Sequence, residues 1–435
     1  MQALVMIMAG GKGTRLYPLS KERCKPTMPI GGRYRLIDFV LSNFTNSGFY
    51  QIKVLTQFMS DSLNRHIFLG WRMSSQLEHF VDIVPPQMRM GESWYLGTAD
   101  AIYQNINIIK NENPDYIFVF GGDHVYKMDV RQMLDYHIEK GADITISTVP
   151  IPLRKASEMG VIETDPYGQI TGFVEKPKNP KPMHKREDMA LVSMGNYIFS
   201  KEVLLEVLNR DHIYEDSAHD FGHNIIPKMI GEYHIYAYDF TKNHWSGMEE
   251  KERGYWCDIG TIDAYWKTNM DLCSVTPRFN LYNQKWPIRT ASNHNPPSKF
   301  VFANEREKRV GRATDSLVSE GCIISGGYVN RSVLSPGVRI NSYASVTDSV
   351  LMEGVKIGRY CKIRKAIIDK DVNIPSHTII GYAPEYDKKH YHVTESGITV
   401  VTKRVEIEVT ESGIAVVTKQ EKPILRIKKS IPTPR

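Results

Sequence analysis

A glycine-rich loop near the start of the chain is the part of the sequence best suited to bind a phosphate. Gly10, Gly11 and Gly13 follow a short apolar run, and glycines let backbone N–H groups approach an anion closely. Two cations just beyond, Arg15 and Lys25, are suited to hold a triphosphate and to neutralise charge on a leaving pyrophosphate. The loop has neither the G-K-[ST] ending of the P-loop nor the G-x-G-x-x-G pattern. By itself it also fits any tight turn between a strand and a helix.

A carboxylate after a second apolar run is a candidate metal ligand. Asp123 follows residues 117–120, which are Ile-Phe-Val-Phe, and two glycines. Ligands bind at the carboxyl ends of strands in open α/β sheets, and carboxylate oxygens suit Mg²⁺ bound to phosphate. The alternative for an aspartate here is a turn cap. The pattern favours phosphoryl chemistry, in which the protein supplies positioning and charge neutralisation.

These residues require a scaffold of alternating strands and helices, and the first 275 residues have that pattern, which predicts parallel α/β units. The predicted strands are Ala3–Ala9, Gln51–Thr56, Tyr116–Gly121, Ile144–Pro150 and Met194–Phe199. Helical spacing occurs over Val130–Lys140 and Ser200–Leu208. The first strand has no basic leader and continues into the glycine loop, so we interpret it as a buried strand and not as a signal peptide.

The pattern changes twice after residue 275. Four prolines, at positions 277, 287, 296 and 297, indicate a linker over 276–310 that packs on its neighbours. Aliphatic residues then recur every six residues, with two slips of one residue: Leu334, Ile340, Val346, Met352, Ile357, Ile363, Ile368, Ile374 and Ile380. This period is typical of hexapeptide β-helices, whose short strands each point one aliphatic side chain inward. It favours a β-helix over 311–403 above an ordinary antiparallel barrel.

The last stretch, 404–435, contains a duplicated strand segment and a basic tail. Residues 393–403 recur as 409–419, with Ala415 in place of Thr399. The copy is either a duplication without function or an added strand pair, and its alternation supports an extended conformation. Much of the net charge of +6 lies in this tail. No nucleic-acid-binding motif accompanies it, so we expect a solvated tail and no nucleic-acid partner.

Composition excludes several other classes. No apolar run approaches the roughly 20 residues that span a bilayer, so no membrane partner is expected. The five cysteines are odd in number and form no C-x-x-C pair. This argues against a disulfide framework and a zinc site, and it fits a reducing cytoplasm.

Five strings together carry a resemblance to a known family. They are G-G-K-G-T-R-L-Y-P-L-S-x-x-R-x-K-P at 10–26, W-Y-L-G-T-A-D-A at 94–101, G-G-D-H-V-Y at 121–126, F-V-E-K-P at 173–177 and W-C-D-I-G-T at 256–261. The first looks like the signature of sugar-nucleotide pyrophosphorylases, and the set resembles bacterial glucose-1-phosphate adenylyltransferases over residues 1 to about 403. The resemblance implies a Rossmann-like nucleotidyltransferase domain over 1–275 and a left-handed parallel β-helix for assembly and regulation. It also implies that ATP and glucose 1-phosphate give ADP-glucose and diphosphate for glycogen or another glucan.

The resemblance also implies roles for single residues. The implied ATP contacts are Ala9, Gly10, Gly11, Gly13, Thr14 and Arg15, with Gln87 at the adenine edge. The implied glucose 1-phosphate contacts are Tyr95, Gly160, Glu175 for the hydroxyls, Lys176 for the phosphate and Ser193. Asp258 joins Asp123 as the second implied Mg²⁺ ligand, although an aspartate there, taken alone, more often caps a turn. Arg15, Lys25, Asp123 and Asp258 are thus the implied catalytic residues.

Regulation and assembly are also implied by resemblance. Members of the enteric type, activated by fructose bisphosphate, have a basic residue at the position of Glu22 and a histidine at that of Pro29. Arg23 and Arg35 remain as candidate regulatory residues. A homotetramer and a phosphorylated effector are expected, and the identity of the effector stays open.

Three other functions compete with this one. A pyrophosphorylase for another sugar nucleotide is disfavoured by W-Y-L-G-T-A-D-A and by G-x-Y-R-L-I-D at 32–38. A non-catalytic regulatory subunit is disfavoured because Arg15, Lys25, Asp123, Lys176 and Asp258 are all present. Acyl transfer by the β-helix is disfavoured because its repeat is short and has no obvious catalytic histidine.

Overall fold

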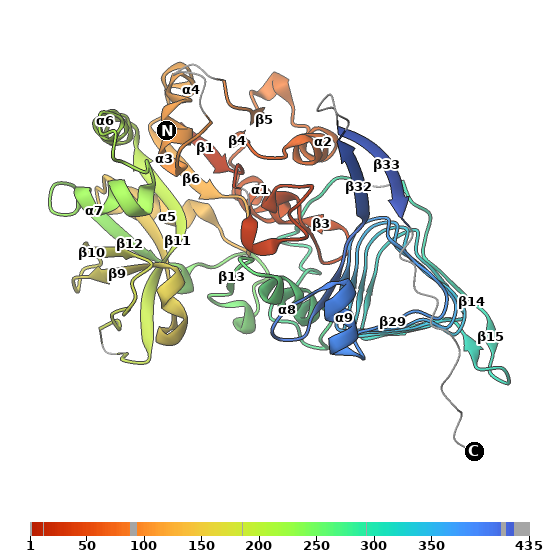
Figure 1. The fold of residues 1–435 in the computed structure, drawn as a ribbon. Helices are drawn as coiled ribbons and strands as arrows, with labels where there is room; N and C mark the ends of the chain where they lie inside the picture. The colour runs from red at the N-terminus through yellow and green to blue at the C-terminus, as the bar shows by residue number, and fades with distance from the viewer. Residues whose placement is uncertain are drawn as a thin grey trace.

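The chain folds into an α/β body followed by a prism of short strands (Figure 1). The computed structural model describes residues 2–11, 13–87, 94–184, 186–292, 294–409 and 415–421. None of the helices in these ranges combines the length and the apolarity that a bilayer crossing requires.

The N-terminal part is built on one mixed sheet, in which nine of the described strands take part. They are β1 (Ala3–Met8), β4 (Gln51–Leu55), β5 (Phe80–Val84), β6 (Tyr116–Gly121), β8 (Ile144–Pro152), β9 (Gly160–Thr164), β10 (Ile170–Glu175), β11 (Met189–Ser200) and β12 (Ile235–Asp239). The order along the sheet is β10-β9-β11-β6-β1-β4-β5, while β8 pairs with β11 and β12. The predicted strands therefore all exist, with ends that differ by a few residues.

The strand directions correct the expectation of parallel units. β1 pairs in parallel with β4 and β6, and β5 continues this arrangement. β11, however, runs antiparallel to β6, β8 and β9, and β9 runs antiparallel to β10. The physical reason is visible in the β9–β10 connection, which consists of residues 165–169. Parallel neighbours need a crossover of about a dozen residues or more, so this link makes a hairpin.

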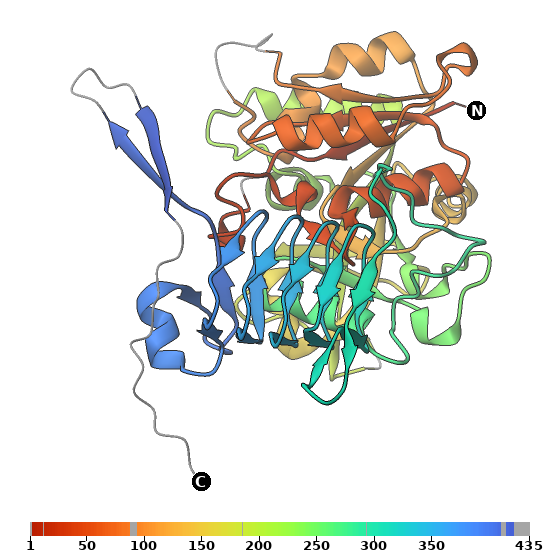
Figure 2. The same cartoon turned by 90° about the vertical axis from the view of Figure 1, so that its right-hand side faces the viewer.

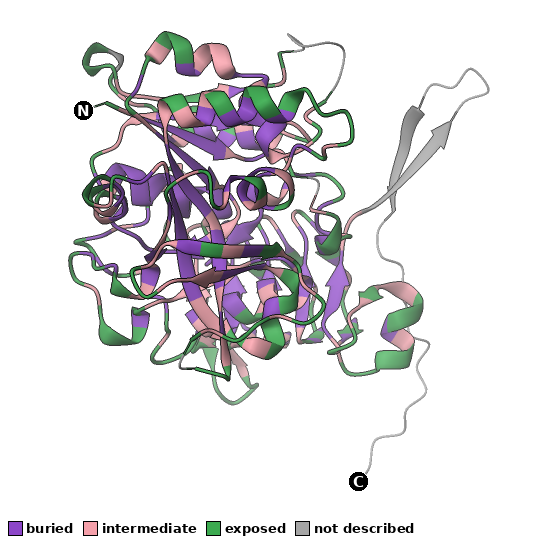
Figure 3. Ribbon diagram, turned by 90° about the vertical axis from the view of Figure 1, so that its left-hand side faces the viewer, coloured by how far each residue is buried: buried purple, intermediate pink, exposed green. Residues whose placement is uncertain are grey.

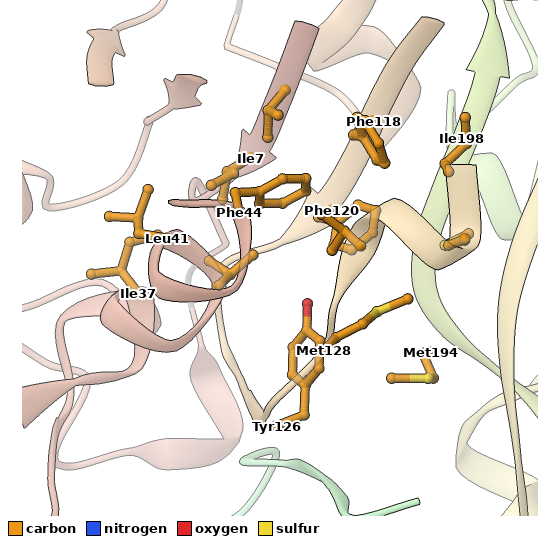
Figure 4. Close-up of a cluster of buried hydrophobic side chains, with 14 of the residues drawn as sticks. Ile7, Ile37, Leu41, Phe44, Phe118, Phe120, Tyr126, Met128, Met194 and Ile198 are labelled. Carbon is orange, nitrogen blue, oxygen red and sulfur yellow. The ribbon is translucent and has the colours of Figure 1, made fainter. Parts of the chain in front are cut away.

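Helices cover both faces of the sheet. They are α1 (Leu36–Asn46), α2 (Asp61–Gly70), α3 (Thr98–Tyr103), α4 (Ile106–Glu112), α5 (Val130–Glu139), α6 (Lys201–His212), α7 (Ile226–Met229) and α8 (Ile262–Leu272), with α9 (Pro384–His390) in the C-terminal part. The strands appear buried beneath helices with exposed outer faces (Figure 3). Alternate residues of one strand enter two different cores: Ile7 packs with Phe44 of α1 and Phe120, as Figure 4 shows, while Met6 packs on the other face.

The C-terminal part is a parallel β-helix with three sheets. The first contains β14 (Lys299–Val301), β19 (Ile323–Ser325), β22 (Arg339–Ile340), β25 (Lys356–Ile357) and β28 (Asn373–Ile374). The second contains β17 (Arg312–Thr314), β20 (Tyr328–Asn330), β23 (Ser345–Thr347), β26 (Lys362–Arg364) and β29 (Ile379–Ile380). The third contains β18 (Leu317–Val318), β21 (Val333–Leu334), β24 (Val350–Leu351), β27 (Ala366–Ile368) and β31 (Thr399–Val401), with β30 (His392–Val393) antiparallel at its edge. Figure 2 shows the coils stacked side by side.

The hexapeptide pattern was assigned correctly except at one position. Leu334, Ile340 and Val346 all point into the interior core, as predicted. The next interior residue is Leu351, whereas Met352 packs in the core shared with the N-terminal part. The five-residue step in the repeat therefore lies between Val346 and Leu351, and not between Met352 and Ile357. Both side chains are buried, so hydrophobicity alone did not separate the interior of the prism from its outer contact.

The third sheet of the β-helix packs on the N-terminal part. Its strands direct Val350 and Ile367 outward into a core that contains Tyr265 and Leu272 of α8. The indole N–H of Trp266 also donates to the backbone oxygen of Asp348 at 2.8 Å. The β-helix therefore contacts the body through apolar surface, which couples the positions of the two parts.

The remaining short strands lie in turns and in the tail. They are β2 (Pro29–Ile30), β3 (Tyr34–Arg35), β7 (His124–Tyr126), β13 (Trp256–Asp258), β15 (Ala303–Asn304), β16 (Arg309–Val310), β32 (Arg404–Val409) and β33 (Ala415–Glu421). The first copy of the duplicated segment supplies β31 of the β-helix, and the second enters an antiparallel pair with β32. A strand pair therefore follows the β-helix, as one of the two interpretations held. Residues 410–414 and 422–435 lie outside the described residues.

Residues 276–298 carry no helix or strand among those described, but they pack closely on their neighbours. Phe279, Trp286 and Ile288 are buried. The Nζ of Lys127, itself buried, donates to the backbone oxygen of Asn280 at 2.5 Å. β14, which begins at Lys299, already pairs with β19 of the β-helix.

Candidate functional site

One cleft of about 600 Å³ collects most of the residues that the sequence singled out. It lies beyond the carboxyl ends of β1 and β6 and extends toward β10 and β11. Its lining includes Gly10, Gly11, Arg15, Tyr95, Asp123, Gly160, Glu175, Lys176, Ser193 and Asp258. A smaller adjoining cavity of about 270 Å³ is lined by Gly13, Thr14, Arg15, Lys25 and Asp123.

Two proposed ATP contacts lie outside these linings. Of the described residues that line the two cavities, none is Ala9 or Gln87. Ala9 is buried beneath the glycine loop, where its N–H donates to the backbone oxygen of Leu55 at 2.9 Å. Gln87 is exposed beyond β5 and donates to the backbone oxygen of Pro85.

The centre of the cleft is a lysine held between two carboxylates. The Nζ of Lys25 lies 2.8 Å from Asp123 Oδ2 and 2.8 Å from Asp258 Oδ1. Burial by itself would raise the pKa of Asp123, but the positive charge of Lys25, with a contribution from His124, lowers it to about 2. Burial by itself would lower the pKa of Lys25, but the two carboxylates raise it above its ordinary value. Asp123 and Lys25 therefore both stay charged near neutral pH.

A short antiparallel ribbon brings the two carboxylates together. Asp123 is the second residue after β6 and directly precedes β7, so it lies at the carboxyl end of a central strand. β13 pairs with β7 in a register that places Asp258 opposite His124. Two carboxylates that are far apart in the sequence thus enter one site from adjacent strands.

The donor set at this centre fits a hard divalent cation. Ligand atoms of Asp123, His124 and Asp258 lie within 4.8 Å of one another. Two carboxylates that converge on one cation supply the oxygen ligands that Mg²⁺ prefers. The ammonium of Lys25 now occupies the point of convergence, so a bound metal would share the two carboxylates with it.

The glycine loop rests directly on the segment that carries Lys25. Gly13 has a φ of 61°, a left-handed conformation that glycine adopts without strain. A Cβ added to Gly13 would lie 3.2 Å from the Cβ of Lys25. At Gly10 an added Cβ would lie 2.9 Å from the Cβ of Gln57. Both glycines therefore permit close packing of the loop on its neighbours beside the cleft.

Arg15 lies at the mouth of the cleft. Its Nη1 is 3.0 Å from Glu158 Oε2, and both side chains are largely exposed. A Cβ added to Gly260 would lie 3.5 Å from Arg15 Nη2, so the guanidinium lies over the loop that follows Asp258. An exposed ion pair of this kind contributes little to stability, which leaves the guanidinium available to a more highly charged partner.

The far end of the cleft carries the residues implied for the sugar phosphate. Glu175 ends β10, and its Oε1 lies 3.0 Å from the Nζ of Lys176, whose φ is 47°. A Cβ added to Gly160 would lie 2.8 Å from Glu175 Oε2. The hydroxyl of Tyr95 accepts a hydrogen bond from Asn105, and Ser193 Oγ accepts one from the N–H of Gly195. Several polar groups thus converge on one end of the cavity.

Sequence reasoning missed several residues that line the cleft. They include Gln57, His124, Glu158, Asp220 and Trp256. His124 and Trp256 lie inside the family strings at 121–126 and 256–261. A prediction that these two strings pair as strands would have placed both residues in the site. The side chain of Gln57 makes hydrogen bonds with both the N–H and the C=O of Tyr95. Nothing local in the sequence indicated Glu158.

The two candidate regulatory arginines have different surroundings. Arg23 is buried, with its Nη1 2.6 Å from Asp369 Oδ1 of the β-helix. Arg35 donates to the backbone oxygen and the Oγ of Ser62. Arg35 also lines a cavity of about 470 Å³ between the two parts, together with Arg33, Arg65, Lys370, Asp61 and Glu353. Of the described residues that line this cavity, none is Arg23.

Comparison with known proteins identifies two matching families. The nucleotidyl transferase family matches residues 4–275, and the GlmU-like C-terminal hexapeptide family matches residues 296–401. A glucose-1-phosphate adenylyltransferase of Anaeromyxobacter sp. (strain Fw109-5) is 56% identical over 406 residues, which cover 93% of this chain and 99% of that protein. One of Thermus thermophilus is 53% identical, covering 92% and 98%. Glucose-1-phosphate adenylyltransferase 1 of Vibrio parahaemolyticus is 47% identical, covering 93% and 98%.

Proposed function

The chain belongs to the glucose-1-phosphate adenylyltransferase family, and we propose that its cleft converts ATP and glucose 1-phosphate to ADP-glucose and diphosphate with the help of Mg²⁺. A phosphate oxygen of glucose 1-phosphate attacks the α-phosphorus of ATP. The bond from that phosphorus to the oxygen bridging to the β-phosphate breaks, and diphosphate leaves in line. The observation that carries the proposal is the convergence of Asp123, Asp258 and Lys25 at 2.8 Å.

The proposed roles follow from charge and position. Asp123 and Asp258 would hold the metal, which neutralises phosphate charge when bound. Lys25 and Arg15 stabilise the charge that develops on the leaving diphosphate. Backbone groups of the glycine loop, residues 9–14, cradle the triphosphate. No group here acts as a covalent nucleophile, which phosphoryl transfer of this type does not require.

The two substrates bind at opposite ends of the cleft. Lys176 binds the phosphate of glucose 1-phosphate, and Glu175 accepts hydrogen bonds from the glucose hydroxyls, with Tyr95, Gly160 and Ser193 around the sugar. This division is supported by the polar groups gathered at that end. The adenine edge is assigned to Gln87, which must reach the base from the loop that follows β5.

Regulation and assembly complete the proposal. Binding of a phosphorylated metabolite is assigned to Arg35, one of the two candidate regulatory arginines, because Arg23 is buried and paired with Asp369. The chain assembles as a homotetramer, and the enzyme works in the cytoplasm to supply ADP-glucose for glycogen or another glucan. Catalysis is assigned to 1–275, with a linker over 276–310 whose last part already supplies β14 of the β-helix, the β-helix over 311–403 and the tail over 404–435. The apolar contact between β-helix and body supports transmission between the parts.

The test is a nucleotide-specificity assay on the purified chain. Diphosphate release from glucose 1-phosphate is measured with ATP, UTP, dTTP and GTP, each with and without Mg²⁺. We expect ATP to be preferred and turnover to require the metal. Preference for another nucleotide would move the chain to a different sugar-nucleotide branch. No turnover with any of them, in a folded sample, would favour a regulatory subunit.

A further inference from the structure

A buried ion pair joins the β-helix to the segment that carries Lys25. Arg23 Nη1 and Asp369 Oδ1 are 2.6 Å apart, and their side chains are only 9% and 12% exposed. Arg23 Nη1 also lies 3.5 Å from the sulfur of Met352. Asp369 directly follows β27, so the contact crosses from one part of the molecule to the other.

The carboxylate of Asp369 is held in place by the backbone of the β-helix. Asp369 Oδ1 accepts a second hydrogen bond, from the N–H of Lys370, at 2.8 Å. The N–H of Asp369 donates to the backbone oxygen of Val401 in β31 at 2.9 Å. The carboxylate is therefore fixed in direction by the ladder of the β-helix, and a charge-assisted hydrogen bond transmits that direction to the guanidinium.

Adhesion between the two parts does not require this pair. The surrounding contact is already apolar and includes Val350, Ile367 and Tyr265. A buried ion pair loses much of its Coulombic gain to desolvation, so apolar residues of similar volume often stabilise a fold as well or better. What the ion pair adds to the interface is a fixed position and direction for the guanidinium of Arg23.

Arg23, whose position the ion pair fixes, is two residues from Lys25 of the reactive centre. Arg23 and Lys25 flank Cys24, which is fully buried and begins the short helical turn Lys25–Thr27. Lys25 reaches Asp123 and Asp258 at 2.8 Å each. A shift of this segment would withdraw the ammonium from both carboxylates and disturb the packing of Gly13 on Lys25.

We propose that Asp369 is a positioning residue for the reaction: through Arg23 it holds Lys25 between Asp123 and Asp258. The β-helix thereby sets the geometry of the phosphate end of the cleft. This inference rests on the proposed role of Lys25 in transfer. It assigns a task to a β-helix carboxylate that touches neither substrate.

The test uses Asp369→Asn in the full chain, which keeps the shape and removes the charge. We expect kcat to fall about 10- to 100-fold, since small displacements of reacting groups cost this much, while both KM values change less than about threefold. Asp371→Asn is the matched control, because its side chain is 64% exposed and pairs with Lys403. Unfolding midpoints check that each variant is folded.

A second measurement does not depend on activity. Labelling by an amine-reactive reagent, followed by peptide mass spectrometry, reports how accessible Lys25 is. Lys53 is an internal standard, because it is equally buried and also lies between two carboxylates, of Asp82 and Glu112. We expect Asp369→Asn to speed the labelling of Lys25 severalfold and to leave Lys53 unchanged.

Two further variants keep the proposal open to refutation. Ile367→Ala weakens the same interface without touching the ion pair. If Ile367→Ala lowers kcat and speeds the labelling of Lys25 as much as Asp369→Asn does, the effect comes from interface stability and the proposal is overturned. Arg23→Lys keeps the charge but loses the fork geometry, and it should repeat the Asp369→Asn result. Unchanged kcat and labelling in folded Asp369→Asn also overturn it. Absence of wild-type turnover would instead refute the proposed function, and the labelling result would still test the positioning.

Discussion

The ammonium of Lys25 lies 2.8 Å from the carboxylate of Asp258, although 233 positions separate the two residues in the chain. The contact closes the reactive centre, because Lys25 belongs to the segment after the glycine loop and Asp258 to a strand just before α8. The position of the Lys25 ammonium therefore depends on both the segment after the glycine loop and the strand that carries Asp258.

The first prediction concerns Asp123. Asp123→Asn should lower turnover by at least about 100-fold, because it removes charge from the proposed metal site and from the partner of Lys25. Steady-state rates at saturating Mg²⁺ measure the effect, with Asp188→Asn as an exposed control. Circular dichroism should show an unchanged fold. A variant that keeps most of its rate would remove Asp123 from the metal site.

The second prediction separates the two substrates. Lys176→Gln should raise the KM for glucose 1-phosphate by about tenfold or more, the loss expected for a charge-assisted hydrogen bond. The KM for ATP should change little. Lys181→Gln is the matched control, because Lys181 is similarly exposed and also pairs with a glutamate. Equal effects of Lys176→Gln on both KM values would place Lys176 outside the sugar-phosphate site.

The third prediction concerns acid stability. Burial lowers the pKa of the His137 imidazole from its ordinary value of 6.5 to about 4, and its Nδ1 lies 2.8 Å from Thr145 Oγ1. The unfolded chain therefore binds a proton that the folded chain excludes between these pH values, so the free energy of unfolding falls as pH falls from about 6.5 to about 4. The contribution is on the order of 3 kcal/mol.

Replacement of the His137 imidazole tests whether this residue causes the loss of stability between pH 6.5 and 4. Denaturant unfolding of His137→Gln at several pH values should show a smaller loss of stability between pH 6.5 and 4 than the wild type shows. His234→Gln, at an exposed histidine, should leave the slope unchanged. If His137→Gln and the wild type lose stability in parallel, the buried imidazole titrates at an ordinary pKa.

The fourth prediction concerns the tail. Removal of residues 404–435 should leave kcat and both KM values nearly unchanged, because β31 from the first copy of the duplicated segment already pairs with β27 of the β-helix. Light scattering of the truncated chain reports its assembly. A monomeric or insoluble product would show that the second copy contributes to assembly.

The fifth prediction concerns fructose 1,6-bisphosphate, which needs several cations to hold its two phosphates. Activation should be weak or absent. Glu22 is exposed, so its repulsion of a phosphate is partly screened. Pro29 offers no side-chain donor, and Arg23 is already paired with Asp369. The half-saturating ATP concentration is measured with and without the bisphosphate, and a strong decrease at low concentrations of it would contradict the prediction.

Local patterns in the sequence were sufficient for much of this protein. β6 was predicted with its observed ends and β1 to within one residue, because an apolar run that ends at or near a glycine is a local signal. β4 was also predicted to within one residue, from its apolar positions alone. The six-residue period predicted the β-helix, since each coil repeats the same short contact with its neighbours. The family resemblance depended on strings of the same local kind.

Tertiary structure alone decided how distant segments meet. Pairing of β13 with β7 brings Asp258 to Lys25, and no feature of the six residues around Asp258 specifies that register. The inward turn of Leu351 and the outward turn of Met352 depend on the neighbouring part of the molecule. So does the pairing of Arg23 with Asp369. Periodicity reports whether a side chain is buried, whereas the partner against which it is buried is set by contacts far away along the chain.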